Sequence, residues 1–87
     1  MGLDAALALH PQVALRPEPF GALAYHYGNR RLTFLRSPDL VALVRSLDEH
    51  PSVDDALSSS SIEQRRWPAL RKALASLADS EVIRRRG

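Results

Sequence analysis

The stretch Phe20–Ser37, FGALAYHYGNRRLTFLRS, decides the fold because it combines two candidate strands, a tight turn and a helix start. Alternating side chains predict one strand over Ala22–Tyr27 and another over Arg30–Arg36. Gly28-Asn29 between them is typical of a two-residue hairpin turn, since both residues tolerate positive φ. The stretch therefore predicts a β-hairpin whose second strand runs into a helix.

The second strand of this hairpin is apolar on both faces. Leu32 and Phe34 share one face, and Thr33 and Leu35 share the other. A very small sheet has too little core of its own to cover both faces, so this strand is predicted to lie at a docking edge. Leu35 is interpreted as a core residue. For Leu32 and Phe34 a core role and a binding role stay equally open.

The hairpin is preceded by one more candidate strand. Val13 and Leu15 alternate with polar or small neighbours over Pro11–Arg16, which indicates a strand with one buried face. Pro17-Glu18-Pro19 is expected to end it, because prolines cannot donate ladder hydrogen bonds. Residues 1–9 are predicted to be a flexible N-terminal arm, residues 10–83 the single folded domain, and residues 84–87 a basic tail.

Helical signals occupy the second half of the chain. Ser37-Pro38 places an N-cap before a proline at the first helical position, and the helix should end before His50-Pro51. Ser52 restarts a short helix, and a third begins near Trp67-Pro68 and ends near Ser80. We therefore predict an α+β fold, winged helix-turn-helix-like, with a three-stranded antiparallel sheet followed by three helices.

Composition excludes several classes of protein. The 87 residues are 45% hydrophobic and 25% charged, with a net charge of +2, which is typical of one small globular domain. The absence of cysteine excludes disulfides, thiolate nucleophiles and iron–sulfur ligands. No apolar run approaches the ~20 residues of a membrane span. These features favour a cytoplasmic protein with no membrane partner.

No catalytic set is visible in the sequence. His10, His26 and His50 lie in three separate segments without the spacing of a metal site. The serine run at 58–61 lacks a nucleophile-elbow context, and no glycine-rich phosphate loop is present. The sequence therefore predicts a protein that is not an enzyme and that holds no cofactor or metal.

One binding interpretation is a winged-helix DNA-binding transcriptional regulator. Basic residues lie at or before the start of the last helix, where a helix-turn-helix protein reads DNA. They are Arg65, Arg66, Arg71 and Lys72. Asp54 and Asp55 on the preceding helix would approach phosphates, and the total charge is low. No nucleic-acid partner is therefore expected, and DNA binding is the alternative hypothesis.

The favoured interpretation is peptide capture. An extended peptide would add a strand along Arg30–Arg36, with alternate side chains entering the groove between this strand and the last helix. Arginines surround that predicted groove and favour an acidic peptide. They are Arg30, Arg31, Arg36 and Arg71.

Four motifs carry a family resemblance. They are His10-Pro11-x-Val13-x-Leu15-Arg16, Gly28-Asn29-Arg30-Arg31-Leu32, Leu35-x-Ser37-Pro38 and His50-Pro51-Ser52-Val53. With them, the chain from Leu9 to Ile83 resembles the peptide chaperones of mycofactocin biosynthesis, which belong to the PqqD-like family of RiPP recognition elements.

The resemblance implies a non-catalytic peptide chaperone. Such proteins bind the leader of a ribosomally made precursor peptide as an added strand and deliver it to a radical S-adenosylmethionine enzyme. Carried onto this chain, the resemblance implies a leader site formed by the third strand and the helix Trp67–Ala78. The candidate contacts are Arg30, Arg31, Leu32, Thr33, Phe34, Leu35, Arg36, Arg71 and Leu74.

Overall fold

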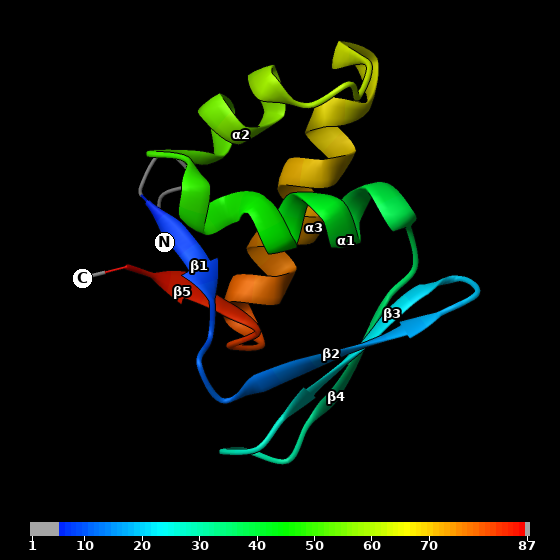
Figure 1. Cartoon of the computed structure of the whole chain (residues 1–87), viewed down its shortest axis with the longest axis vertical. Coiled ribbons are helices and arrows are strands. Elements are labelled where there is room, and N and C mark those ends of the chain that lie inside the picture. The colour runs from blue at the N-terminus through cyan, green and yellow to red at the C-terminus, as the bar shows by residue number, and fades with distance from the viewer. Residues whose placement is uncertain (1–5, 87) are drawn as a thin grey trace.

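A computed structural model describes residues 6–86 and shows the predicted antiparallel sheet (Figure 1). The sheet comprises β2 (Val13–Glu18), β3 (Gly21–His26) and β4 (Leu32–Leu35) in the order β2-β3-β4. Leu23 lies opposite Phe34 in the β3–β4 ladder. The strand that the sequence identified as a docking edge is therefore an edge strand of its sheet.

The helices begin at the predicted caps. The Ser37 side chain accepts the Leu40 N–H ahead of α1 (Pro38–Ser46), which continues into the 3-10 turn η1 (Leu47–Glu49). Ser52 caps α2 (Val53–Ser59) through the Asp55 N–H. A second 3-10 turn, η2 (Gln64–Arg66), leads into α3 (Trp67–Asp79). The predicted α+β class with three helices after the sheet is confirmed.

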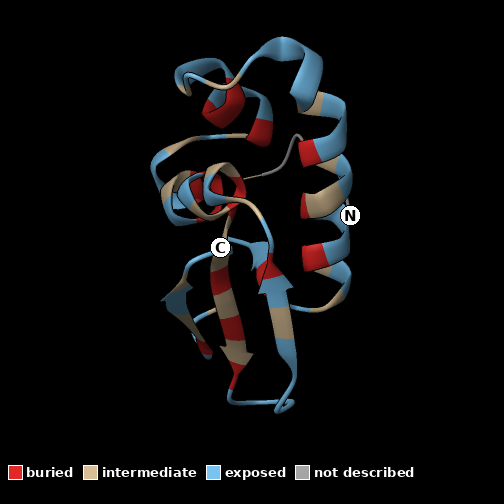
Figure 2. Ribbon diagram, turned by 90° about the vertical axis from the view of Figure 1, so that its right-hand side faces the viewer, coloured by how far each residue is buried: buried red, intermediate tan, exposed pale blue. Residues whose placement is uncertain are grey.

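The core lies between the helices and one face of the sheet. Figure 2 shows the buried residues of α3 turned toward the rest of the molecule and away from solvent. Leu70, Leu74 and Leu77 provide that buried stripe, and Ala22, Ala24 and Leu35 provide the sheet side. No helix among the described residues is long and apolar enough to span a membrane.

The two ends of the described chain form a second, small sheet. β1 (Leu7–Leu9) pairs antiparallel with β5 (Ile83–Arg85), and Leu7 and Ile83 are fully buried. The sequence predicted an N-terminal arm over residues 1–9 and a basic tail over residues 84–87, so the structure differs at both ends. Each strand is too short to be recognised alone, and only the fold brings them together. Residues 1–5 and 87 lie outside the described residues.

The first strand of the main sheet extends further than predicted. Pro17 lies inside β2, opposite Ala22, and the turn to β3 is made by Pro19-Phe20. The expectation that Pro17 ends the strand was wrong because β2 is an edge strand. A proline is tolerated there when its nitrogen faces away from the neighbouring strand.

The hairpin between β3 and β4 is longer than the predicted two-residue turn. The Arg30 N–H donates to the His26 carbonyl at 2.7 Å, and Arg30, not Gly28, adopts the left-handed φ of 61°. Gly28 is needed for space, since a Cβ there would overlap the Gln12 side chain and approach the His26 ring. The loop therefore presents Arg30 and the neighbouring Arg31 at the start of β4.

Gly21 should be the least replaceable glycine for stability. Its φ is +148°, and a Cβ would overlap the Leu35 carbonyl oxygen of the neighbouring strand. We expect Gly21→Ala to lower the free energy of unfolding by about 2–4 kcal/mol in urea denaturation. Gly28→Ala is the control and should cost less, because the flexible Gln12 side chain can move away. Equal costs for the two variants would contradict this packing.

Candidate functional site

The outer edge of β4 presents unpaired backbone groups. The His26 N–H donates to the Arg31 carbonyl at 3.0 Å. In an antiparallel ladder, every second residue forms backbone hydrogen bonds with the neighbouring strand. Because Arg31 is one of these residues, Thr33 and Leu35 also direct their backbone groups toward β3. Leu32 and Phe34 consequently direct their N–H and C=O groups away from the sheet. This edge can accept another extended chain.

The opposite edge of the sheet is less available. The same alternation in the β2–β3 ladder turns the nitrogens of Val13, Leu15 and Pro17 outward. Pro17 has no N–H, and the Val13 N–H already donates to the His10 carbonyl at 2.9 Å. Prolines and satisfied donors protect an edge from added strands. Of the two edges, β4 therefore offers the better docking position.

A groove opens where β4 ends. It encloses about 410 Å³ between the segment after β4, the start of α1 and one face of α3. Its lining comprises Arg36, Ser37, Leu40, Arg65, Arg66, Ala69, Leu70 and Ala73. Arginines surround an apolar floor. The small side chains of Ala69 and Ala73 leave the space open.

The arginines of the groove differ in their partners. Arg65 pairs with Glu63 at 2.8 Å, and Arg66 pairs with Asp39. The Arg36 guanidinium lies 5.4 Å from the centre of the Phe34 ring, and no carboxylate of residues 6–86 pairs with it. Arg36 is thus the groove cation with its charge available to a ligand.

The structure separates the predicted site residues of β4 into two groups. The side chains of Leu32 and Phe34 are 58% and 54% exposed, whereas Leu35 is fully buried. Thr33 is half-buried, on the same face as Leu35. Arg30 and Arg31 are exposed at the start of the strand. The face that sequence reasoning left undecided is therefore the solvent face for Leu32 and Phe34.

The two predicted residues of the last helix do not face the groove. Leu74 is completely buried, and Arg71 pairs with Asp54 of α2. The groove is lined instead by Arg66, Ala69, Leu70 and Ala73, which stand at positions i, i+3, i+4 and i+7 and so share one helix face. That spacing is visible in the sequence, but it becomes informative only once one knows which side of α3 meets β4.

Comparison with known proteins identifies the chain. A sequence model of the peptide chaperone MftB family matches residues 6–84. The chain belongs to the peptide chaperone MftB family. It is 44% identical over 80 residues to the peptide chaperone MftB of Mycobacterium ulcerans, covering 92% of this chain and 73% of that protein. It is 40% identical to that of Mycobacterium tuberculosis, with the same coverage, and 41% identical to that of Mycolicibacterium smegmatis, covering 92% and 78%. No solved structure is significantly similar to it.

The MftB family assignment confirms the resemblance noted in the sequence. It supports a peptide chaperone role in mycofactocin biosynthesis. A chaperone role is not catalytic, and the chain is accordingly not an enzyme.

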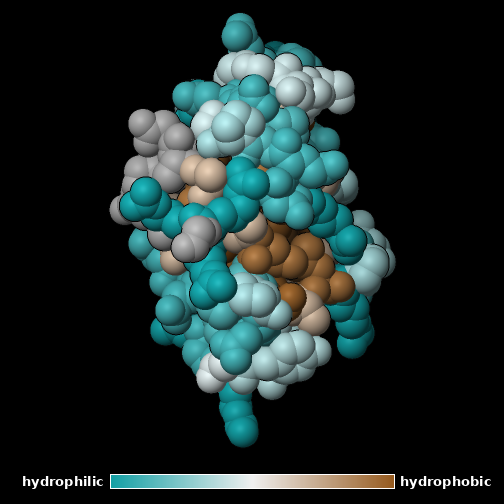
Figure 3. All heavy atoms as spheres, turned by 60° about the vertical axis from the view of Figure 1, so that its left-hand side comes forward, coloured by the Kyte–Doolittle hydropathy of each residue, from teal (hydrophilic) through white to brown (hydrophobic). Residues whose placement is uncertain are grey.

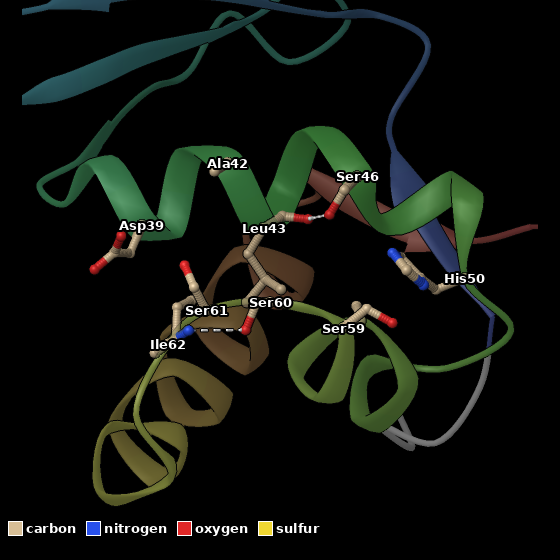
Figure 4. Close-up of a pocket in the computed structure, with 10 residues that line it drawn as sticks. Asp39, Ala42, Leu43, Ser46, His50, Ser59, Ser60, Ser61 and Ile62 are labelled. Atoms are coloured by element: carbon tan, nitrogen blue, oxygen red, sulfur yellow. Dashed lines mark hydrogen bonds between the residues drawn. The ribbon is translucent and has the colours of Figure 1, made fainter.

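A second pocket of this MftB-family chain has no catalytic arrangement. It encloses about 300 Å³ between α1, α2 and the serine segment (Figure 4). Ser46 donates to the Leu43 carbonyl at 3.0 Å, and Ser60 donates to the Leu57 carbonyl at 2.6 Å. His50 pairs through Nδ1 with Asp55 at 2.7 Å. These two hydroxyls donate to backbone carbonyls, and no hydrogen bond within residues 6–86 joins either of them to His50.

The face in Figure 3 carries one continuous apolar surface bordered by polar side chains. A further opening of about 370 Å³, lined by Leu9, Leu15, Val44, Arg45 and Asp48, lies between β1, β2 and α1. Its wall is formed by Leu9 and Leu15, which are half-buried and pack against the core, and by Val44, which is buried in the core. It lacks the free strand edge that accompanies the groove beside β4.

Two histidines that are distant in sequence meet behind the hairpin loop. The ring centres of His10 and His26 are 4.4 Å apart. His26 is buried, and its Nδ1 accepts the N–H groups of Gly28 and Asn29, so its proton lies on Nε2. No cluster of three or more metal-ligating residues occurs in residues 6–86. The pair serves to hold the loop ahead of β4.

The environment of His10 lowers its pKa below the ordinary value of 6.5. Loss of water contact on burial is the main cause of the lower pKa. The nearby charges of His26 and Arg84 lower the pKa further, and the charge of Glu81 raises it. Because the folded pKa is lower, the unfolded chain binds more protons between the two pKa values. The stability from this histidine is present above pH 6.5 and is lost as pH falls through the folded pKa.

His10→Asn should therefore flatten the acid side of the stability profile. Urea denaturation between about pH 7.5 and pH 5 measures the slope, and the wild-type chain should lose more stability than the variant. Asn is chosen because its side-chain oxygen can replace His10 Nδ1 as acceptor for the Gln12 N–H. An unchanged slope in the variant would show that another group controls the acid response.

Proposed function

We propose that this chain binds the leader of a mycofactocin precursor peptide as an added strand along β4. It then delivers the peptide to a radical S-adenosylmethionine enzyme. The unpaired backbone edge of Leu32 and Phe34 beside an apolar groove is the observation that carries the proposal. An added strand gains main-chain hydrogen bonds from such an edge and specificity from pockets for alternate side chains. We place this encounter in the cytoplasm.

The roles of the candidate contacts follow from their positions. Leu32 and Phe34 offer backbone hydrogen bonds, and their side chains flank the guest on the solvent side. Thr33 lies on the inner face, and Leu35 and Leu74 support the site from the core. Guest side chains on the inner face enter the groove over Leu40, Ala69 and Ala73.

Charge selects for an acidic guest. Arg30 and Arg31 precede β4 and Arg36 follows it, and none of these three pairs with a carboxylate among the described residues. A leader strand would therefore run between positive groups at both ends of β4. Complementary charges raise association rates and fix orientation more than they raise affinity. Arg71 is excluded from this set by its pairing with Asp54.

The mechanism needs no chemistry from this chain. Holding a flexible peptide beside its enzyme replaces a bimolecular encounter with a nearly intramolecular one, which raises the effective concentration. The leader loses conformational freedom on binding, and its contacts must exceed that cost. The chaperone must also contact the enzyme while the peptide is bound.

The alternative function, DNA binding, has less support. Arg65, Arg66 and Arg71 are engaged with Glu63, Asp39 and Asp54. Phosphate contacts would first require breaking these pairs, and the net charge of +2 offers little general attraction. The proposed peptide capture uses the β4 edge and the groove and does not require these ion pairs to break.

Filling the groove should weaken leader binding. Ala69 is an exposed residue of α3 on the groove, and Ala69→Trp would occupy the space meant for guest side chains. Isothermal titration with a synthetic leader should show affinity weakened by about tenfold or more. Ala75→Trp is the matched control, since Ala75 is also exposed on α3 but does not line the groove.

The control should bind the leader as the wild type does, and both variants should unfold at similar urea concentrations. Equal leader affinity for Ala69→Trp and wild type would remove the groove from the binding site. Equal losses in both variants would place the effect in the helix as a whole.

Removing one edge N–H should weaken leader binding separately from any side-chain effect. Phe34→Ala and Phe34→Pro both lose the ring, but only proline lacks the N–H that points away from β3. We expect the proline variant to bind the leader about 2–10-fold more weakly than the alanine variant in the same titration. The β2–β3 ladder shows that proline fits at an outward position, since Pro17 occupies one. Identical affinities would contradict strand addition at this edge.

A further inference from the structure

The outer face of the main sheet is apolar over β3 and β4 and is uncovered by any described element, whereas β2 contributes Arg16 and Glu18 to it. Leu23 lies opposite Phe34, and Tyr25 lies opposite Leu32, so all four project from the same face. We call this surface the aromatic face; its members are Phe20, Leu23, Tyr25, Tyr27, Leu32 and Phe34. The large apolar side chains that are strongly exposed in residues 6–86 all belong to it, with Tyr27 at 62% and Phe20 at 40%.

The aromatic face is ordered by contacts among its own side chains. The rings of Phe20 and Phe34 meet edge to face with centres 5.8 Å apart. Tyr25 and Tyr27 make a similar contact at 4.9 Å. Such pairs hold the rings in place before any partner arrives, which lowers the entropic cost of binding. Scattered exposed apolar residues need no explanation, but a preformed aromatic cluster indicates a binding surface.

The charges without an ion-pair partner at the rim of the aromatic face, among residues 6–86, are positive, because on the β2 side Arg16 pairs with Glu18 at 3.0 Å. Arg30 and Arg31 lie at the loop end, and Arg36 stacks over Phe34 at the other end. If two copies of the chain met through this face, the arginines of one copy would lie near those of the other and repel them. The face itself measures about 300 Å², from its six residues on β3, β4 and the adjoining turns, whereas a stable dimer buries about 800 Å² per partner. Charge therefore argues against self-association and favours a partner with carboxylates around an apolar patch, and the small area fits a transient contact.

We infer that the aromatic face docks the enzyme that modifies the peptide, through an apolar patch rimmed by carboxylates, and that the bound leader completes this surface. The inference rests on the proposed leader site. A guest strand on β4 would lie about 4.8 Å beyond it and present alternate side chains on the aromatic face. The chain with bound leader thus offers the enzyme a wider sheet than the chain without it. The enzyme should therefore bind more tightly after the leader has bound.

The acidic helix α2 is the competing surface for the enzyme. Asp54 pairs with Arg71 and Asp55 pairs with His50, so both carboxylates already have partners within the fold. Its apolar residues Val53, Ala56 and Leu57 are buried. This helix offers a partner neither free charge nor apolar area.

Binding of the purified radical S-adenosylmethionine enzyme, with and without synthetic leader, tests the inference. The main variant is Leu23→Thr/Tyr25→Thr, which removes the apolar centre of the face while keeping strand-forming residues. Both changes lie on β3, one strand away from the leader edge. We expect enzyme affinity to fall about tenfold or more while leader affinity stays within about twofold. Tyr27→Ser, in the loop, gives a second variant that leaves the strands intact.

Ala69→Trp is the reciprocal control. It should lose the leader and the leader-dependent gain in enzyme affinity, yet retain the leader-free enzyme affinity of the wild type. Added salt should weaken enzyme binding, because the rim contacts are charged.

Unchanged enzyme affinity in both aromatic-face variants, with leader binding intact, would overturn the inference. So would enzyme binding that does not respond to the leader. A wild-type chain that binds the enzyme but not the leader would instead refute the proposed leader site, and the aromatic-face variants would still decide where the enzyme docks.

Discussion

The burial of Leu35 at the end of β4 is the constraint on which the rest of the site depends. A strand exposes alternate residues to opposite faces, so fixing Leu35 in the core turns Leu32 and Phe34 outward. A register shift of one residue would turn Leu35 toward solvent and turn Leu32 and Phe34 toward the core. Gly21 locks this register, since the backbone approaches the Leu35 carbonyl too closely for any side chain. Core packing, rather than the binding site itself, therefore sets the geometry of the edge.

The two edges of the sheet differ in their free backbone groups, and this difference supports the proposed strand addition at β4. Pro17 and the occupied Val13 N–H protect β2, while β4 keeps its outward donors and acceptors. An unprotected edge ordinarily invites aggregation. Here it is only a few residues long, and arginines at both of its ends disfavour pairing with another positive edge. Short length and charge thus disfavour pairing between two copies of this edge, and the same charge would favour the acidic guest that we propose.

Local signals in the sequence predicted the elements that local chemistry controls. Ser37-Pro38 and Trp67-Pro68 located two helix starts, and the alternation around the hairpin located two strands. What could not be predicted depends on distant contacts. The pairing of β1 with β5 joins the two ends of the domain, and the partner of Arg71 lies on another helix. The side of α3 that meets β4 is likewise a property of the packed fold, which is why Leu74 was placed in the groove wall.

Amide hydrogen exchange on β4, with and without the synthetic leader, tests the central claim most directly. An added strand would take up the outward N–H groups of Leu32 and Phe34, while Thr33 and Leu35 are already bonded to β3. We predict that the leader slows exchange at Leu32 and Phe34 far more than at Thr33 and Leu35. Leader binding that leaves the Leu32 and Phe34 amides exchanging at their free rates would contradict it.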